Sequence, residues 1–190
     1  SILAKVLKKL NPQIKLCGAG GFLMEKEKVE IYYNLLDLAV VGFWEVIKNI
    51  KKFREIFRFL VKKLDEVKPN LVILIDFPGF NLRFAQEVKK RNIKLIYYIS
   101  PQVWAWGKNR IKLIKKFVDK MIVVFKFEEE LYKSYGIDVV FVGHPLLDIV
   151  KPTGPKEQLR EKYKIEPSKK IISLLPGSRE MEVKRHLPLL

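Results

Sequence analysis

The chain alternates short apolar runs with longer amphipathic segments, and this alternation restricts its fold more than any other feature. The runs have the length of strands, whereas segments such as 82–92 and 127–136 have the spacing of helices. Strands that are apolar on both faces are typical of a parallel sheet covered by helices. We therefore predict an α/β fold, a parallel sheet with helices on both faces. The predicted strands are IKLCG (14–18), NLVILID (70–76), IKLIYYIS (93–100), DKMIVVF (119–125) and DVVFVG (138–143).

The positions of these runs also indicate how the chain is divided. Residues 1–150 contain all of them and form one predicted domain. Residues 151–170 have three prolines, one glycine and a short helical pattern with little to bury, which is typical of a linker. Residues 171–190 then begin a new strand, turn and helix, which we interpret as the first unit of a second domain.

The composition excludes some classes of protein and leaves others open. The net charge of +16 favours polyanions, namely nucleic acids, anionic lipids or phosphorylated substrates, but a solvated lysine-rich surface fits it as well. The single cysteine, Cys17, excludes an intrachain disulfide and fits a reducing compartment. No apolar run reaches the roughly 18 residues of a membrane span. No metal site is expected, because the two histidines and the cysteine are widely separated.

The segment LIDFPGFN (74–81) carries the strongest catalytic candidate. Asp76 ends an apolar run, and Pro78 and Gly79 force a turn directly after it. Binding residues of parallel sheets collect at the carboxyl ends of the strands, where flanking phenylalanines would partly desolvate this carboxylate. Such a setting suits a general base. The alternative is a carboxylate that caps the next helix or pairs with a lysine.

Within the segment SPQVWAWGKNRIKLI (100–114), Pro101 ends the predicted strand 93–100, and residues 102–107 form the predicted loop at its carboxyl end. If the loop is extended, Trp104 and Trp106 point the same way and form one wall of a cleft. Arg110 and Lys112 follow at the start of a helix, where they could meet a phosphate. The alternative is that both indoles pack into the edge of the sheet. His144 follows the last predicted strand; it could face a cleft, or it could be a structural histidine.

Two glycine-containing turns are candidates for close approach to a ligand. In GAGGFLM (18–24), adjacent glycines favour either such an approach or a tight turn; the spacing differs from the dinucleotide fingerprint, and no helix clearly follows. In LLPGSREMEV (174–183), the backbone N–H groups of a turn before a helix, with Arg179, form a predicted anion site. The alternative there is a Ser178 helix cap beside a surface arginine.

Residues 43–64 predict a long helix with two different faces. Val46, Ile50, Phe53, Phe57, Leu60 and Leu64 form a stripe that faces the core. Other aromatic and aliphatic residues lie among lysines, which suits an anionic membrane surface, although a neighbouring domain or subunit could cover them instead. Nucleic acid is not an expected partner, because no recognisable nucleic-acid motif surrounds them. The predicted membrane contacts are Trp44, Ile47, Lys48, Lys51, Phe59 and Lys62.

Taken in order, these segments resemble one family along nearly the whole chain. GAGGFLM, DLAVVGFWEV, LIDFPGFN, YYISPQVWAWGKNRI, FVGHPLLD and LLPGSREMEV together resemble lipid-A-disaccharide synthase, an inverting glycosyltransferase of bacterial outer-membrane lipid biosynthesis. The SPQVWAW block is the most specific part. The resemblance departs at Lys126-Phe127-Glu128, where the family commonly has Pro-Phe-Glu. It also implies a chain without the family's first strand and most of its second domain.

The resemblance implies a GT-B fold, with two Rossmann-like domains facing across a cleft, and a specific reaction. UDP-2,3-diacylglucosamine would donate its sugar to 2,3-diacylglucosamine 1-phosphate, giving a β-1,6-linked disaccharide and UDP, with no cofactor or metal. Asp76 would be the base. The implied substrate-binding residues are Gly20, Gly21, Asn81, Ser100, Gln102, Trp104, Trp106, Arg110 and His144, and the implied nucleotide-binding residues are Gly177, Ser178, Arg179 and Glu182.

The resemblance further implies a peripheral protein on the cytoplasmic face of the bacterial inner membrane, with anionic lipids as partners and a homodimer left open. Two other functions are kept as alternatives. One is a non-catalytic module that binds anionic membranes, and the other is a different UDP-sugar enzyme of the same fold.

Overall fold

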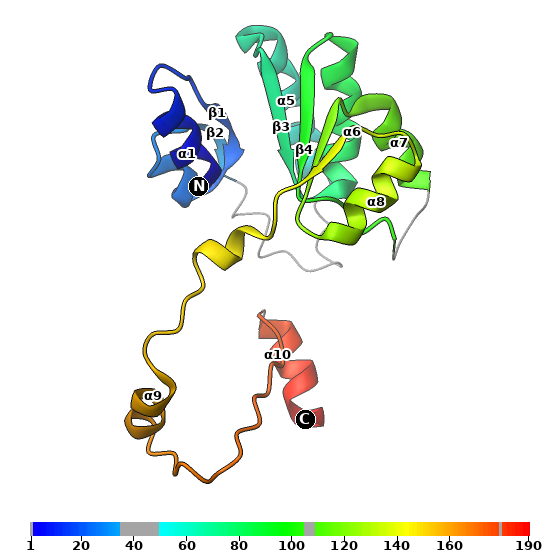
Figure 1. Cartoon of the computed structure of the whole chain (residues 1–190). Coiled ribbons are helices and arrows are strands. Elements are labelled where there is room, and N and C mark those ends of the chain that lie inside the picture. The colour runs from blue at the N-terminus through cyan, green and yellow to red at the C-terminus, as the bar shows by residue number, and fades with distance from the viewer. Residues whose placement is uncertain (1, 35–49, 105–108, 179) are drawn as a thin grey trace. The chain divides into compact units, whose positions relative to one another are not determined.

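The computed structural model describes residues 2–34, 50–104, 109–178 and 180–190 (Figure 1). The chain divides into two compact units, Ser1–His144 and Pro145–Leu190.

The first unit is built on a four-stranded parallel sheet with the order β3-β4-β5-β6. Four apolar runs form these strands, so the predicted α/β fold with a parallel sheet is confirmed. Ile75 pairs with Tyr98, and Val123 pairs with Phe141, so the strands end close to one another at the same edge. Their bounds are Leu71–Ile75 (β3), Lys94–Tyr98 (β4), Lys120–Val123 (β5) and Val139–Phe141 (β6).

Four helices cover this sheet (Figure 1). α6 packs on β3 and β4, and α8 packs on β5 and β6, while α6 also contacts α5 and α7. Leu95, Tyr97 and Met121 of the strands are fully buried, as is Ile114 of α7. Burial of each such aliphatic side chain contributes about 1.5–3 kcal/mol. The helices are Ile50–Val67 (α5), Pro78–Lys90 (α6), Asn109–Phe117 (α7) and Lys126–Ser134 (α8).

The start of the chain forms a separate two-stranded parallel sheet, which corrects the prediction of one continuous sheet. The strand expected at 14–18 lies at Cys17–Gly20 (β1), and it pairs with Glu30–Asn34 (β2), which the sequence did not predict. β2 was missed because its polar ends hide its short apolar centre. A helix at Phe22–Glu25 (α2) also follows the glycines, contrary to expectation, and Ile2–Leu10 forms α1.

The described part of the second unit contains helices only. Its elements are the 3₁₀ helices Pro145–Asp148 (η1) and Leu187–Leu189 (η2) and the α-helices Lys156–Lys162 (α9) and Glu180–His186 (α10). The strand expected near 171–175 is not formed, because no described residue of this unit provides a partner strand. Ile172 and Leu175 of that run are exposed.

Candidate functional site

Asp76 lies in a tightly held turn between β3 and α6. Its carbonyl oxygen accepts hydrogen bonds from the Tyr97 hydroxyl (2.6 Å) and from Asn81 Nδ2 (2.7 Å). Asn81 Nδ2 also donates to the carbonyl of Ile75 at 3.1 Å. Asp76 and Phe77 both have left-handed backbones, with φ of 48° and 45°. Such a pair costs about 1–3 kcal/mol per residue and persists only where surrounding contacts hold it, as these hydrogen bonds do. The Asp76 side chain itself is exposed.

Tyr97 connects three of the predicted site residues. It is fully buried, and burial is the main cause that raises the pKa of its hydroxyl. The negative charge of Asp76 raises this pKa further, whereas Asn81 and the positive charge of Arg110 lower it. Asp76, Asn81 and Arg110 therefore lie within electrostatic range of one hydroxyl, at the edge where the strands end.

The loop after β4 presents a tryptophan to solvent above a buried polar cluster. Ser100 is buried, and its Oγ lies 2.7 Å from the Tyr132 hydroxyl and donates to the carbonyl of Pro101 at 2.8 Å. Trp104 is 53% exposed, so the alternative that this indole is buried as packing is wrong. Gln102 is exposed as well. Trp106 lies outside the described residues.

Exposed aromatic rings form a ridge along this edge of the sheet. The indole of Trp104 meets the ring of Phe127 edge to face, with 5.6 Å between centroids. Phe127 stacks on Phe125 at 5.8 Å, and Phe125 lies 5.9 Å from the His144 ring. Trp104, Phe125 and His144 follow β4, β5 and β6 in turn. Sequence reasoning missed Phe125 and Phe127, although their place directly after an apolar run was the signal that could have found them.

Glu128 supports this ridge from below, and it was also missed. Its side chain is only 1% exposed, and burial raises the pKa of its carboxyl group. Hydrogen bonding by the Phe125 backbone, Ser100 and the Trp104 indole partly offsets this rise. The Phe125 N–H donates to Glu128 Oε2 at 3.4 Å. Glu128 therefore holds the loop after β4 and the start of α8 together.

One glycine of each predicted turn, Gly20 or Gly177, faces a side chain of its own segment. A Cβ on Gly20 would lie 2.3 Å from Met24 Sδ, so this position needs glycine for local packing. Gly21 begins α2 and accepts from the Met24 N–H at 2.8 Å. A Cβ on Gly177, where φ is +135°, would lie 2.5 Å from Glu182 Cβ.

The predicted anion site in the second unit is occupied by a carboxylate of the same chain. The Ser178 N–H donates to Glu182 Oε2 at 3.0 Å. Glu182 therefore stands where an anionic ligand would meet this N–H. Arg179 lies outside the described residues.

Part of the predicted membrane helix is described, as α5. Leu60 and Leu64 are buried and Phe53 and Phe57 are half-buried, as predicted for the core-facing stripe; Ile56, which the stripe omitted, is buried too. Among the predicted membrane contacts, Lys51, Phe59 and Lys62 are exposed. Trp44, Ile47 and Lys48 lie outside the described residues, as does Val46 of the stripe.

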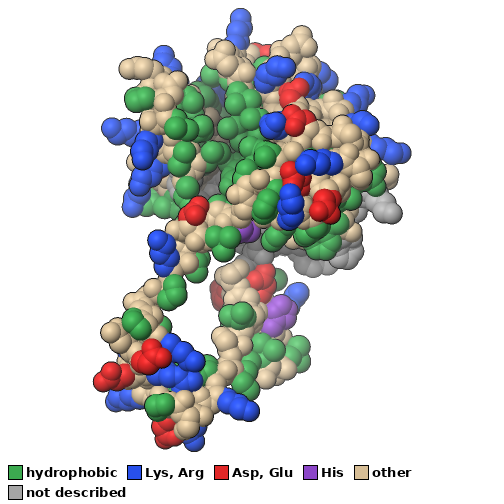
Figure 2. Space-filling view, viewed as in Figure 1, with side chains coloured by type: hydrophobic (Ala, Val, Ile, Leu, Met, Phe, Trp, Pro, Cys, Tyr) green, Lys and Arg blue, Asp and Glu red, His purple; other side chains and the backbone are tan. Residues whose placement is uncertain are grey.

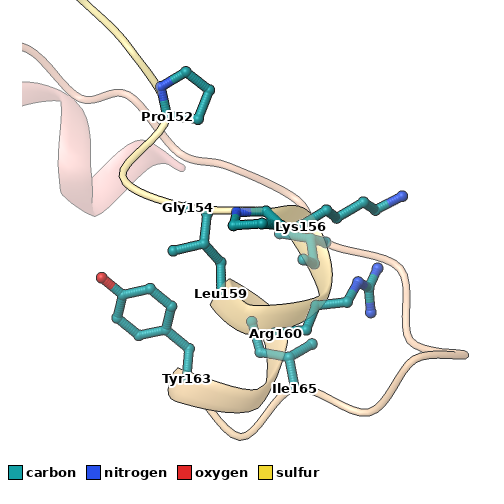
Figure 3. A pocket seen from close by; sticks show the side chains of 9 residues that line it. Pro152, Gly154, Lys156, Leu159, Arg160, Tyr163 and Ile165 are labelled. Carbon is teal, nitrogen blue, oxygen red and sulfur yellow. The ribbon is translucent and has the colours of Figure 1, made fainter.

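Two further surface features, the distribution of charge on the first unit and a hollow beside α9, add no residue to the predicted sites. Lysine and arginine side chains are scattered over the visible face of the first unit, with acidic side chains between them (Figure 2). A hollow beside α9 is lined by Pro152, Leu159 and Tyr163, among others (Figure 3). No described helix is long and apolar enough to cross a membrane. The described residues also contain no group of three or more His, Cys, Asp and Glu side chains that could hold a metal ion.

The parallel sheet and the helices around it define a Rossmann-like α/β domain, with the candidate side chains at the carboxyl edge of the sheet. The family model for lipid-A-disaccharide synthetase matches residues 1–190. The chain is 44% identical over 188 residues to a lipid-A-disaccharide synthase of Coxiella burnetii (strain Dugway 5J108-111), a match that covers 99% of this chain and 50% of that protein. It is 43% identical over 189 residues to lipid-A-disaccharide synthase 1 of Legionella pneumophila (strain Lens), covering 99% of this chain and 49% of that protein.

The chain belongs to the lipid-A-disaccharide synthetase family. It spans about half the length of the curated relatives that it matches.

Proposed function

We propose that this chain provides the acceptor side of a glycosyltransferase of lipid A biosynthesis. The reaction would transfer 2,3-diacylglucosamine from UDP to 2,3-diacylglucosamine 1-phosphate, with inversion, to give the β-1,6-linked disaccharide and UDP. The family match over residues 1–190 is the observation that carries this proposal. In this scheme residues 1–150 bind the acceptor, 151–170 link the domains, and 171–190 begin the domain that binds the nucleotide.

Asp76 is the proposed general base. Inversion requires a group that takes the proton of the acceptor hydroxyl while its oxygen attacks the anomeric carbon from the face opposite UDP. An exposed carboxylate in a turn fixed by Tyr97 and Asn81 supports this role, because a base must be held at a constant position to remain within reach of that hydroxyl. Arg110 is proposed to bind the phosphate of the acceptor. Trp104 is proposed to form a wall of the acceptor site beside it.

The leaving UDP needs its growing negative charge stabilised, and Gly177, Ser178 and Arg179 are proposed for this role. Since Glu182 accepts from the Ser178 N–H, a diphosphate that binds there must displace this carboxylate. Because both substrates carry acyl chains, we further propose that the exposed Lys51, Phe59 and Lys62 contact anionic lipids on the cytoplasmic face of the inner membrane.

The proposal is tested by assaying disaccharide formation in detergent, with the protein that carries this chain at the length of its relatives. UDP-2,3-diacylglucosamine and 2,3-diacylglucosamine 1-phosphate are supplied together, and mass spectrometry follows the product. We expect a disaccharide that appears only when both substrates are present. No product would overturn the proposal, and equal turnover of unacylated sugars would favour a soluble-acceptor UDP-sugar enzyme instead.

We also propose that the reaction needs no metal ion. The side chains proposed for catalysis supply a base and cationic groups without one, so turnover is expected to be unchanged in excess EDTA. The same assay, with and without EDTA, measures this. A loss of turnover that added magnesium restores would contradict it.

A further inference from the structure

A groove lies between α5 and the first turn of α6, beside the turn that holds Asp76. Its volume of about 470 Å³ falls within the range of ligand pockets, ~300–1,000 Å³. Phenylalanine rings and arginine side chains line it, and a Cβ on Gly79 would meet no atom within 4 Å, so the groove is open above that residue. The aromatic lining residues are Phe53, Phe57, Phe77 and Phe80, and the basic ones are Arg54, Arg58 and Arg83.

The aromatic lining is continuous. Phe57 meets Phe80 edge to face at 5.5 Å, and Phe80 stacks on Phe77 at 5.9 Å. Phe77 in turn lies 6.3 Å from Phe53. Phe53, Phe57 and Phe80 are half-buried against the core, whereas Phe77 is 46% exposed. The rings thus present one connected apolar surface, and an apolar ligand would shield it from water.

The basic lining is without ion pairs among the described residues. Arg54, Arg58 and Arg83 are exposed, and no described carboxylate pairs with any of them. Elsewhere in the same unit, Arg91 forms ion pairs with Asp65 at 2.6 Å and with Glu87 at 3.1 Å. Guanidinium groups that lack a carboxylate partner can bind the oxygens of a phosphate in a forked geometry.

We propose that this groove binds one acyl chain of a phosphate-bearing lipid, with the arginines contacting its phosphate. An apolar floor beside arginines that have no carboxylate partner in the described part of the chain matches an amphiphile that has both an acyl chain and an anionic head. This assignment rests on the proposed function, in which Asp76 is the base. Phe77, which lines the groove, follows Asp76 directly in the chain. A lipid held in the groove would bring its sugar toward the proposed base, which would make the groove an acyl subsite of the acceptor; the single phosphate of the acceptor would then be shared between these arginines and Arg110.

The geometry points to a single lipid molecule rather than to a bilayer surface. The groove runs between two helices, and Lys51, Phe59 and Lys62, the described residues of the predicted membrane surface, do not line it. The two kinds of lipid contact therefore involve different side chains and can be separated by substitution.

The test measures binding of dodecyl phosphate to the 190-residue chain by calorimetry, below the concentration at which this amphiphile forms micelles. Inorganic phosphate supplies the anion alone, dodecyl maltoside supplies the chain without the charge, and phosphatidylglycerol vesicles supply a bilayer. We expect dodecyl phosphate to bind at least about tenfold more tightly than phosphate or the maltoside, because only it engages both linings.

Two variants remove the two linings separately. The triple variant Arg54→Gln, Arg58→Gln, Arg83→Gln is expected to weaken binding at least about tenfold, whereas removing the same charge outside the groove should not. Phe77→Asn is expected to weaken it about tenfold, and asparagine tolerates the left-handed backbone at this position. The matched controls are the triple variant Lys52→Gln, Lys115→Gln, Lys116→Gln, at exposed lysines outside the groove, and the exposed-ring variant Phe22→Asn. Circular dichroism verifies the fold of each.

The outcomes separate the groove from the proposed function. The assignment of the groove as a lipid site would be overturned by wild-type affinity in both groove variants. Binding to vesicles without binding to dodecyl phosphate would overturn it as well. If dodecyl phosphate fails to bind while the disaccharide is still formed, the groove is not a lipid site, and the proposed function remains. If it binds as expected but no disaccharide is formed, the proposed function fails and the groove remains as a lipid site.

Discussion

Replacing Asp76 with asparagine is expected to lower the rate of disaccharide formation at least about a hundredfold, the lower end of what a positioned general base contributes. Asparagine has nearly the same shape and tolerates the left-handed backbone, with φ of 48° at this position. The hydrogen bonds from Tyr97 and Asn81 reach the backbone carbonyl, so the substitution leaves them in place. Only the ability to take a proton is lost. Initial rates at saturating substrate, measured by mass spectrometry, give the ratio.

The matched control for this variant is Asp138→Asn. Asp138 precedes β6, at the opposite edge of the sheet, and forms an exposed ion pair with Lys120 at 3.0 Å. Such a pair contributes about 0–1 kcal/mol, so the rate of this variant should stay near that of the wild type. If Asp76→Asn keeps its rate, the base lies elsewhere, and His144 is the next residue to replace.

The sequence predicted the central sheet because its strands carry their own signal. Runs such as LVILI and KMIVV are apolar on both faces, and only a sheet covered on both sides buries them. The predicted position of Asp76 follows from the same signal, since a residue after such a run lies at the carboxyl edge. The segment expected to form a strand near 171–175 has four apolar residues around Ser173, but in the described second unit no strand is present to pair with it. An apolar run alone therefore does not make a strand.

The missed elements depend on contacts that a local pattern does not contain. β2 carries glutamate and asparagine at its ends, and it forms a strand because β1 pairs with it. Glu128 lies among three consecutive glutamates, a pattern typical of a solvated helix face. It is buried beside Ser100 and Trp104, which both belong to the loop after β4 and are distant from it in the sequence. The aromatic ridge was missed for the same reason. Phe125 and Phe127 form it only together with Trp104 and His144, which come from other loops.

Replacing Glu128 with alanine is expected to lower the free energy of unfolding by about 1–3 kcal/mol, since it removes the acceptor of buried hydrogen bonds. The Trp104 indole also loses the carboxylate that helps to orient it. The KM for the acceptor should therefore rise more than kcat falls, if Trp104 is part of the acceptor wall. Glu130→Ala is the matched control: this exposed neighbour lies on the same helix, and its loss should change the free energy of unfolding by no more than about 0.5 kcal/mol. Urea unfolding measures stability, and steady-state kinetics measures the two constants.

The pH dependence of stability separates the charge of Glu128 from its hydrogen bonds. Burial raises the pKa of this carboxyl group above its ordinary value of 4.5. Between the ordinary and the raised pKa the folded chain holds a proton that the unfolded chain has released, so this group's contribution to stability falls as the pH rises through that window. Glu128→Gln keeps an acceptor oxygen but does not titrate. The stability of the wild type relative to Glu128→Gln should therefore decrease as the pH rises from 4.5 and level off above the raised pKa. A difference that stays constant across this range, or one that increases, would mean that the Glu128 carboxylate is not penalised by burial.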